Sequence, residues 1–554
     1  MKPGQFPTTL WGRKFIAFFF VSLFFCQVIL AQQKLAVIRA NSNKVSIKDG
    51  SVYQKGIWNI SPEIRPDVYQ TLEPRHEKTI VFYTDIDSIS VKVAPQATYD
   101  FIILLNNRDS CYTRISNIKP VKEPEKKLIL TDLLSPEKLK QDFTTFRVAL
   151  EKEHAGLYRY KSKKEMDAIF DRYFAALDHP VSPIEFGKTV LSVISALQDG
   201  HTRSNVPRLL GSYYSDNIKV FSLFLYFIEN KAYVLCGQEL PAQAEILTID
   251  GQSVADIQSE LFRYLPSDGT IETKKRSQLN DGAFPILYHW IFGDKHSFRV
   301  EFKNKNGETG TINLAGKSVK DIECDFRNKP AVTKPLQLDF LQNNVALLTV
   351  KSFDDNRINA AQLNFREFLE TSFKEINTRK ISTLIIDVRN NGGGADDYGA
   401  LLYSYLTGKP FKYFASKSSV TSAVTLQENP LLGFQQPQKN NFTGNILFLI
   451  NGVSFSTTAD FCSIARSQNR GKFIGEETGG GYYGNTSGKS VTITLNNSQI
   501  EVTIPQFKYV NDVKKAKYKD RGTIPDYIVL PSIEDVILNK DVQLNYALKL
   551  ANTK

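Results

Sequence analysis

The sequence predicts a multidomain α+β protein whose carboxyl-terminal part is α/β. The chain has 554 residues, and several domains are expected because one hydrophobic core rarely grows past about 300 residues. Its 42% hydrophobic and 12% aromatic content is typical of a folded chain and not of a disordered one. The period of the apolar residues changes along the chain, and these changes give the predicted boundaries.

The first 31 residues have the pattern of a secretory signal peptide. Lys2, Arg13 and Lys14 precede an apolar run at 15–30, which ends before Ala31. This run is shorter than the about 20 residues of a spanning helix, so we expect cleavage after Ala31 and no stable membrane insertion of the mature chain; an uncleaved anchor is the alternative. The prediction is an exported protein, in the periplasm, on the outer cell surface or in the medium.

Charge and cysteine spacing exclude several classes of partner and cofactor. The formal charge of +11 falls to +8 when the three basic residues of the signal segment are removed, and no zinc finger, recognition helix or RNA-binding motif accompanies the basic residues, so nucleic acid is not expected. The cysteines of the mature chain lie far apart without metal-ligand spacing, and we expect four thiols and no disulfide framework: Cys111, Cys236, Cys324 and Cys462. No metal or cofactor motif is visible, and the oligomeric state is not predicted.

The amino-terminal half is predicted to contain a β domain followed by helices. Residues 32–125 alternate apolar and polar side chains in short runs at 79–83, 88–93 and 100–105, which indicates an accessory β-sandwich. Residues 126–210 change to helical spacing, and their last helix is expected to end at Asp199-Gly200, where glycine suits a helix terminus. His201 stands directly beyond that terminus.

The strand pattern returns at 211–330. Apolar strands are predicted at 221–227, 232–235, 245–251 and 297–302. The stretch "ILTIDGQSV" resembles the strand and turn of a PDZ domain, so this segment is predicted to be PDZ-like. No Gly-Leu-Gly-Phe type loop is present, and capture of a peptide carboxylate by such a loop is therefore not predicted.

The last part, 331–554, alternates apolar strands with helices. Strands are predicted at 345–350, 383–387 and 446–450, and helices at 365–376, 398–406 and 458–467. Apolar strands between helices indicate a mostly parallel sheet covered on both faces. Ligands of such sheets tend to bind at the carboxyl ends of the strands.

Two loops at that edge carry candidate chemistry. The first, 387–394, ends in three glycines whose N–H groups can approach an oxyanion, although a flexible turn is an equal alternative. The second, 451–460, joins a strand to a helix and contains Ser456 and Thr457. A serine at such a turn can expose its hydroxyl while the next N–H faces developing negative charge, but serines there are often simple helix caps.

Three motifs resemble one known family. "LIIDVRNNGGG", "LINGVSFSTTADF" and "FIGEETGGG" are similar to the catalytic domain of the carboxyl-terminal-processing and tricorn-type serine peptidases, over about two hundred residues. The resemblance implies a crotonase/ClpP-like α/β fold with Ser456 as nucleophile, between Ser454 and Thr458, and Ser454 is the rival. It implies an oxyanion hole of the N–H groups of Gly393 or Gly394 and Thr457.

The general base departs from the processing branch of the family. That branch places a lysine where this sequence has Gly481, and the later Lys489 is displaced by eight residues and is expected in the following strand. Serine needs a base near neutral pH, and histidine is suited to that role. His201 lies in "LQDGHTRS", similar to the Asp-Gly-His-Thr stretch of tricorn-like members, so His201 is the predicted base.

The orienting acid is less defined by the motifs. Tricorn-like enzymes use a carboxylate shortly before "G-x-x-P-D", which implies Asp520 in "KDRGTIPD", whereas Asp526 is expected to be a turn or cap residue. Asp199, close to His201, is the second candidate. The prediction is a cofactor-free serine endopeptidase acting on peptides or proteins; the alternative is a catalytically silent relative that binds a ligand or protein in the cell envelope.

Overall fold

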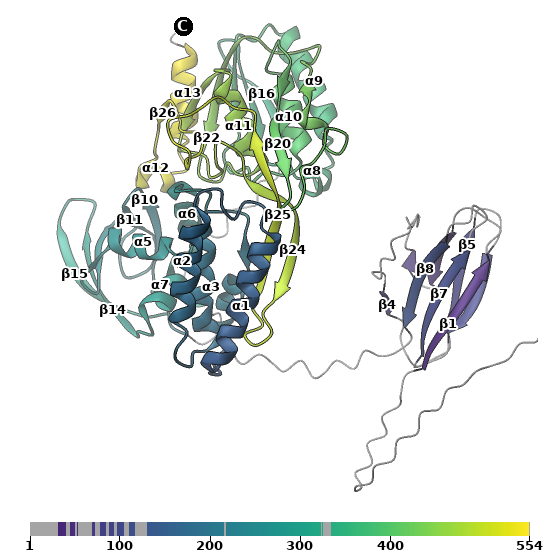
Figure 1. The fold of residues 1–554 in the computed structure, drawn as a ribbon. Coiled ribbons are helices and arrows are strands. Elements are labelled where there is room, and N and C mark those ends of the chain that lie inside the picture. Colours follow the sequence, from purple (N-terminus) through teal and green to yellow (C-terminus); the bar gives the residue numbers. More distant parts are fainter. Residues whose placement is uncertain are drawn as a thin grey trace, which may run out of the picture. The chain divides into compact units, whose positions relative to one another are not determined.

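The computed structural model describes the backbone of eight strands in residues 32–116 and, with side chains, residues 130–214, 218–322, 324 and 334–552. The chain forms two compact units, 1–127 and 128–554 (Figure 1). The predicted signal segment, 1–31, lies outside the described residues. Among the helices that are described, none combines the length and the apolar character that crossing a bilayer requires.

The amino-terminal unit contains two four-stranded sheets, ordered β1-β7-β8-β4 and β3-β2-β5-β6. Its strands are β1 (Gln32–Arg39), β2 (Val45–Asp49), β3 (Val52–Tyr53), β4 (Tyr69–Thr71), β5 (Lys78–Thr84), β6 (Ser88–Val93), β7 (Ala97–Leu104) and β8 (Ser110–Ser116). The predicted runs 79–83 and 88–93 lie in β5 and β6, residues 100–104 of the third run lie in β7, and residue 105 lies outside the described residues. The packing of the two sheets as a sandwich stays a prediction.

The second unit begins with a helical segment. Its elements are α1 (Pro136–Glu153), α2 (Lys163–Ala175), α3 (Pro183–Leu197), the two-residue strand β9 (Arg203–Ser204) and α4 (Val206–Tyr214). Ser162 and Ser182 begin α2 and α3 as N-caps, each accepting a backbone N–H of the first turn. The expected cap at Gly200 was wrong, because Gln198 ends α3 in the left-handed region with φ 59°.

Residues 218–322 form an antiparallel sheet ordered β10-β11-β12-β14-β15, with three helices. The elements are β10 (Phe224–Ile228), β11 (Lys231–Cys236), β12 (Glu245–Ile249), β13 (Gln252–Ser253), α5 (Val254–Phe262), α6 (Glu272–Gln278), α7 (Phe284–Phe292), β14 (Ser297–Lys303) and β15 (Thr309–Ala315). These α-helices were not predicted. For α7, with the sequence FPILYHWIF, the reason is that apolar side chains surround the helix and leave no helical period.

A disulfide joins Cys236 at the end of β11 to Cys324. This corrects the expectation of four thiols, which rested on sequence spacing alone; 88 residues separate the two cysteines, but their Cα atoms lie 5.2 Å apart. Cys462 is a buried free thiol, as expected.

The carboxyl-terminal part is built on a six-stranded sheet ordered β16-β17-β18-β22-β23-β26, parallel except for β16. The strands of this part, which also form two smaller sheets, β19-β21 and β20-β25-β24, are β16 (Leu336–Phe340), β17 (Val345–Val350), β18 (Thr383–Asp387), β19 (Phe411–Lys412), β20 (Phe414–Ser418), β21 (Phe434–Gln435), β22 (Asn445–Ile450), β23 (Lys472–Gly475), β24 (Thr486–Thr494), β25 (Glu501–Asn511) and β26 (Tyr527–Ile528). Its helices are α8 (Asp355–Ala360), α9 (Phe365–Thr378), α10 (Asp396–Ser404), α11 (Thr457–Ser467), α12 (Ile533–Ile537) and α13 (Val542–Asn552).

Both faces of this sheet are covered, as predicted. Leu384 and Ile386 of β18 belong to a core with α9, α10 and α11, while Ile385 between them packs with Ala547 of α13. Successive side chains of a strand point to opposite faces, so a continuous apolar strand serves both layers. The mostly parallel covered sheet is therefore confirmed.

A long hairpin, β24–β25, leaves the carboxyl-terminal part and packs along α1 (Figure 1). Its residues Leu495, Ile500, Val502 and Ile504 join the core of the helical segment. Strand β9 adds to β25 in antiparallel register, with Arg203 opposite Thr503 and Ser204 opposite Val502. The residues that follow His201 are thus part of a sheet contributed by the carboxyl-terminal part.

Truncating the core side chain Phe448 tests this packing. Phe448 of β22 is 0% exposed and its ring stacks on Phe473 at 4.6 Å. Phe448→Ala is expected to lower the free energy of unfolding by about 3–5 kcal/mol through lost burial and a residual cavity. The exposed Phe434, 67% accessible, is the matched control, and Phe434→Ala is expected to change stability by less than about 0.5 kcal/mol. Urea unfolding followed by circular dichroism measures both, and equal losses would contradict the core assignment.

Candidate active site

Ser456 occupies the turn between β22 and α11 in a strained conformation. Its φ of 57° and ψ of −132° lie outside the regions that L-residues commonly adopt, and its side chain makes no capping hydrogen bond. The simple helix-cap interpretation therefore does not apply to this serine. Its Oγ lies 3.1 Å from Nε2 of His201, which is 255 positions away in the chain.

Ser454, the rival nucleophile, is buried and engaged. Its hydroxyl donates to the carbonyl of Val388 at 2.9 Å and accepts the N–H of Asn451 at 3.1 Å. These bonds fix the turn, and they leave the hydroxyl inaccessible to a substrate.

The three-glycine loop packs directly against the serine turn. Gly393 and Gly394 have φ of 102° and 147°, and a Cβ on Gly393 would lie 2.7 Å from Cβ of Ser456. The N–H of Gly393 donates to Oδ1 of Asn391 at 2.9 Å, whereas the N–H groups of Gly394 and Thr457 have no acceptor among the described residues. Gly394 and Thr457 are therefore the better placed of the predicted oxyanion donors, and Gly393 supplies space.

Thr457 also ties the two loops together through its side chain. Its hydroxyl lies 2.9 Å from the carbonyl of Gly394 and 2.9 Å from Oδ1 of Asp396. Burial raises the pKa of Asp396, and the hydrogen bond with Thr457 opposes this by lowering it. The orientation of the Gly394 peptide is fixed by this chain of hydrogen bonds.

His201 is oriented by stacking and not by a hydrogen bond to Nδ1. Its ring lies 4.4 Å from the ring of Phe455 at an interplanar angle of 28°, and Nδ1 is buried without a partner among the described residues. Burial lowers the pKa of His201 to about 3; Asp199 opposes this only in part, and Lys274 and Arg203 add to it. The imidazole is neutral at physiological pH, as a general base must be.

Neither predicted acid is hydrogen-bonded to His201. The Asp520 carboxylate accepts the hydroxyl of Thr270 at 2.8 Å, because the loop before "GTIPD" is paired with the segment at 267–270. Asp199 accepts Nε2 of His154 at 3.0 Å and the N–H of Thr202 at 2.9 Å. The structure thus places Asp199 beside His201 but gives its hydrogen bonds to other residues.

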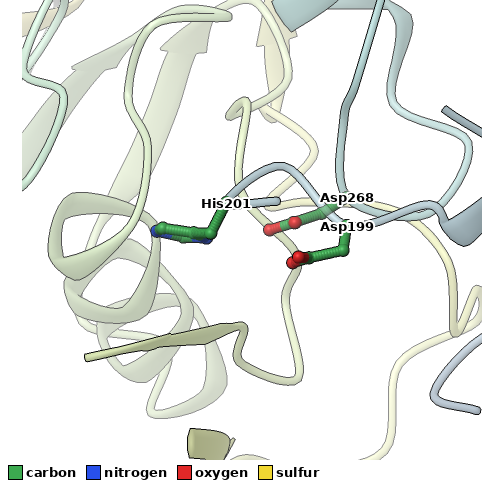
Figure 2. A group of neighbouring side chains, drawn as sticks. All are labelled: Asp199, His201 and Asp268. Carbon is green, nitrogen blue, oxygen red and sulfur yellow. The ribbon is translucent and has the colours of Figure 1, made fainter. Parts of the chain in front are cut away.

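Asp268, His154 and Lys274 adjoin the site although no motif indicated them. Ligand atoms of Asp199, His201 and Asp268 all lie within 4.8 Å of one another, and Figure 2 shows both carboxylates on one side of the imidazole. Such a group could hold a divalent cation. Nδ1 of His154 accepts the N–H of Gly156, so Nε2 carries the proton that Asp199 accepts.

The structure leaves no lysine at the position used by the processing branch. Gly481 forms an isolated bridge with Gly522, and Lys489 lies exposed on β24, as expected. Lys274 of α6 lies beside the serine turn: its Nζ lies 3.1 Å from the centre of the Phe455 ring and donates to the carbonyl of Gly200 at 3.0 Å.

A cleft of about 550 Å³ opens beside the serine turn. It lies between the β10–α6 region and the glycine and serine loops, and its walls include Tyr226, Thr273, Lys274, Gly392, Phe455 and Glu476. Ligand pockets are typically lined by aromatic and apolar side chains with a few polar or charged groups, and these walls carry both kinds.

Comparisons with known proteins identify the family of one domain and proteins with a similar fold. Residues 344–529 match the model of peptidase family S41, and no curated protein matches the sequence. The structure is similar to mature CPAF complexed with lactacystin (TM-score 0.53, 13% identity, 75% of this chain and 98% of that chain) and to mature CPAF (0.53, 14%, 75% and 96%). The photosystem II D1 C-terminal processing protease is more distant (0.34, 13%, 72% and 96%).

The fold and the matched domain define the protein as a serine-type peptidase, a hydrolase. Residues 344–529 form a domain that matches peptidase family S41. The predicted family is therefore confirmed, while the roles of individual residues are taken up as proposals.

Gly393→Ala tests the contact between the two loops. The new Cβ would meet Ser456 at 2.7 Å and force a side chain into φ 102°, so turnover is expected to fall about a hundredfold or more while the fold is kept. Gly408→Ala is the control, because that Cβ meets nothing within 4 Å. Peptide hydrolysis and thermal unfolding of both variants are measured side by side. Full activity of Gly393→Ala would contradict the close contact between the two loops.

The low pKa of His201 gives a second prediction. A histidine with its usual pKa near 6.5 is about 97% protonated at pH 5, whereas His201 is expected to remain neutral there because of its burial and the nearby cations. Imidazole NMR signals, assigned by comparison with His201→Asn, should show no titration of this ring between pH 5 and 8. A midpoint near 6.5 would show that the ring is solvated and would contradict the described environment.

Proposed function

We propose that the protein is an exported serine endopeptidase that cleaves peptide bonds through an acyl-enzyme on Ser456, with His201 as general base. The observation that carries this proposal is the 3.1 Å separation of Ser456 Oγ and His201 Nε2 at a strained strand-to-helix turn. A hydroxyl within hydrogen-bond reach of a neutral imidazole has the arrangement that serine nucleophiles need. This assignment places the protein with the His-dependent, tricorn-like members of the family.

The reaction follows from the positions of these groups. Ser456 Oγ attacks the peptide carbonyl as its proton passes to His201 Nε2, and the N–H groups of Gly394 and Thr457 bind the oxyanion. The C–N bond then breaks, and His201 gives the proton to the leaving amine. Water attacks the resulting ester, again with His201 as base, and releases the acid and the free serine.

Lys274 is the competing general base. Burial lowers its pKa to about 8, opposed by Asp268, and such a pKa suits a catalytic lysine. Its ammonium, however, contacts the Gly200 carbonyl and the Phe455 ring, and the described contacts do not join it to Ser456. His201 is therefore the preferred base.

The substrate is proposed to lie in the cleft as an extended peptide or protein segment. The segment 211–330 would act as a PDZ-like wall, because its edge strand β10 lines the cleft. The backbone N–H and carbonyl of Phe227 in β10 are both bonded to the side chain of Asn280, at 2.7 and 3.0 Å. A peptide adding to this edge as a strand would have to displace Asn280.

Export is proposed from two independent features. The first 31 residues have the pattern of a signal peptide, and the disulfide between Cys236 and Cys324 suits an oxidising compartment. Periplasm, cell surface and medium are all compatible with these features, and the amino-terminal sheets are proposed to serve as an accessory domain.

Labelling with a fluorophosphonate tests the enzyme against a silent binding protein. The enzyme is expected to form an adduct on Ser456, located by mass spectrometry, that Ser456→Ala abolishes and His201→Ala strongly reduces. Either substitution should lower turnover of peptides by roughly a thousandfold or more. Ser454→Ala is the matched control and should keep the adduct. Absence of labelling of folded wild-type protein would favour the silent relative.

A further inference from the structure

Gly200, the residue before His201, is bonded at both of its backbone polar groups by one short segment. Its N–H donates to Oδ1 of Asp268 at 2.7 Å, and its carbonyl accepts Nζ of Lys274 at 3.0 Å. Asp268 precedes α6 and Lys274 lies within it, so both bonds come from residues 268–274. The backbone leading into His201 therefore has its position set from outside its own loop.

Only glycine fits between these partners. A Cβ at Gly200 would lie 2.6 Å from Nζ of Lys274 and 2.9 Å from the ring of Phe455. Since α3 ends at Gln198 and Gly200 is not its cap, this close approach gives the reason for the glycine in "DGH". Any larger residue at this position would clash with Lys274 or Phe455.

The carboxylate of Asp268 also contacts the loop that packs on the Ser456 turn. Oδ2 of Asp268 accepts the N–H of Gly481 at 3.0 Å, and the preceding Gly480 is so close to the serine turn that a Cβ there would lie 3.2 Å from the nitrogen of Ser456. Asp268 is 1% exposed and uses both oxygens. It thus links the loop of His201 to the loop that packs on Ser456.

Lys274 acts on the ring of His201 through Phe455. Its ammonium sits over the Phe455 ring, and the imidazole of His201 is stacked on that ring. A cation over an aromatic face is attracted to it, most strongly where water is excluded. Since Nδ1 of His201 has no hydrogen-bond partner among the described residues, this stack and the Gly200 backbone carry its orientation.

We propose that Asp268 and Lys274 are positioning residues that hold His201 within hydrogen-bond reach of Ser456. Asp268 does so by accepting the backbone N–H of Gly200, and Lys274 by donating to its carbonyl. The inference rests on the proposed function, because it assigns a purpose to the His201–Ser456 contact. In this arrangement the pair does the work that an aspartate bonded to Nδ1 does in other serine peptidases.

Two other roles for these groups predict different behaviour. Asp268, Asp199 and His201 could bind a divalent cation, although Lys274 already supplies positive charge to both carboxylates (Figure 2). Lys274 could instead be the general base. A metal role makes activity sensitive to chelation, and a base role requires a neutral lysine, whereas the positioning role requires the charged one.

The central experiment compares three single variants by kcat and KM on a peptide substrate. Lys274→Met removes the charge and the donor and is expected to lower kcat about a hundredfold with KM changed less than about threefold. Lys274→Arg keeps both and should recover kcat to within about tenfold of wild type. Lys275→Met is the matched control: the neighbouring Lys275 also donates to a carbonyl, that of Phe262, at 2.8 Å, and burial also lowers its pKa to about 8. It touches neither Gly200 nor Phe455 in the described contacts, so kcat should stay near wild type.

The pH profile separates positioning from base catalysis. Lys274 faces Asp268, Asp199 and Arg203 and acts on His201, and its pKa near 8 means that the ammonium is lost above that pH. In the positioning role kcat falls above pH 8, and Lys274→Arg removes this fall because arginine stays charged. A rise of kcat through pH 8, with an inactive Lys274→Arg, would assign the base to Lys274 and overturn the proposal.

Asp268→Asn examines the second half of the pair. The amide cannot accept at both oxygens, so one of the N–H groups of Gly200 and Gly481 loses its partner, and kcat is expected to fall about a hundredfold. Hydrogen exchange of the peptide covering 198–204 should become faster while distant peptides are unchanged. Wild-type kcat in Asp268→Asn or Lys274→Met, or loss of activity in wild-type protein on treatment with EDTA, would overturn the proposal. Failure of the wild type to label on Ser456 would instead refute the proposed function.

Discussion

The contact between His201 and Ser456 depends on the pairing of β9 with β25. His201 belongs to the helical segment and Ser456 to the carboxyl-terminal part, and 255 positions separate them along the chain. The two-residue strand after His201 adds to the long hairpin that the carboxyl-terminal part sends across α1. Backbone hydrogen bonds of a sheet fix distance and direction together, so this short ladder sets where the imidazole meets the hydroxyl.

Strain and close packing are concentrated where the two parts meet. Ser456 has a positive φ, Gly393 and Gly394 adopt backbone conformations that favour glycine, and Gly200 is enclosed by side chains. Strained conformations persist only where several surrounding contacts hold them in place. Here the hydrogen bonds of Asn391, Thr457 and Asp268 provide such contacts. Rigid placement of this kind reduces the reorganisation needed when charge develops on the substrate.

Much of the fold and part of the site could be predicted from the sequence, for identifiable reasons. The strands β17, β18 and β22 and the helices α9 to α11 carry strong period signals, and glycine and serine motifs mark the two loops. The helix α7 was missed because it is apolar on every side. Asp268 and Lys274 lie in a loop and a helix that carry no motif, and the role proposed for them rests on tertiary contacts with Gly200. Asp520 was expected near His201 from motif order, but its carboxylate accepts Thr270. Sequence spacing likewise gave no sign of the disulfide.

The hairpin β24–β25 also links the carboxyl-terminal part to the core of the preceding segments. Its apolar side chains Leu495, Ile500, Val502 and Ile504 are buried in a core whose other members come from residues 139–322. A fragment restricted to the family-matching region, 344–529, would carry this hairpin without the helices that pack on it. It would expose an unpaired strand edge and the apolar side chains of the hairpin to water. Such a fragment would be prone to self-association, so the peptidase domain defined by homology is smaller than the piece of chain that can exist by itself.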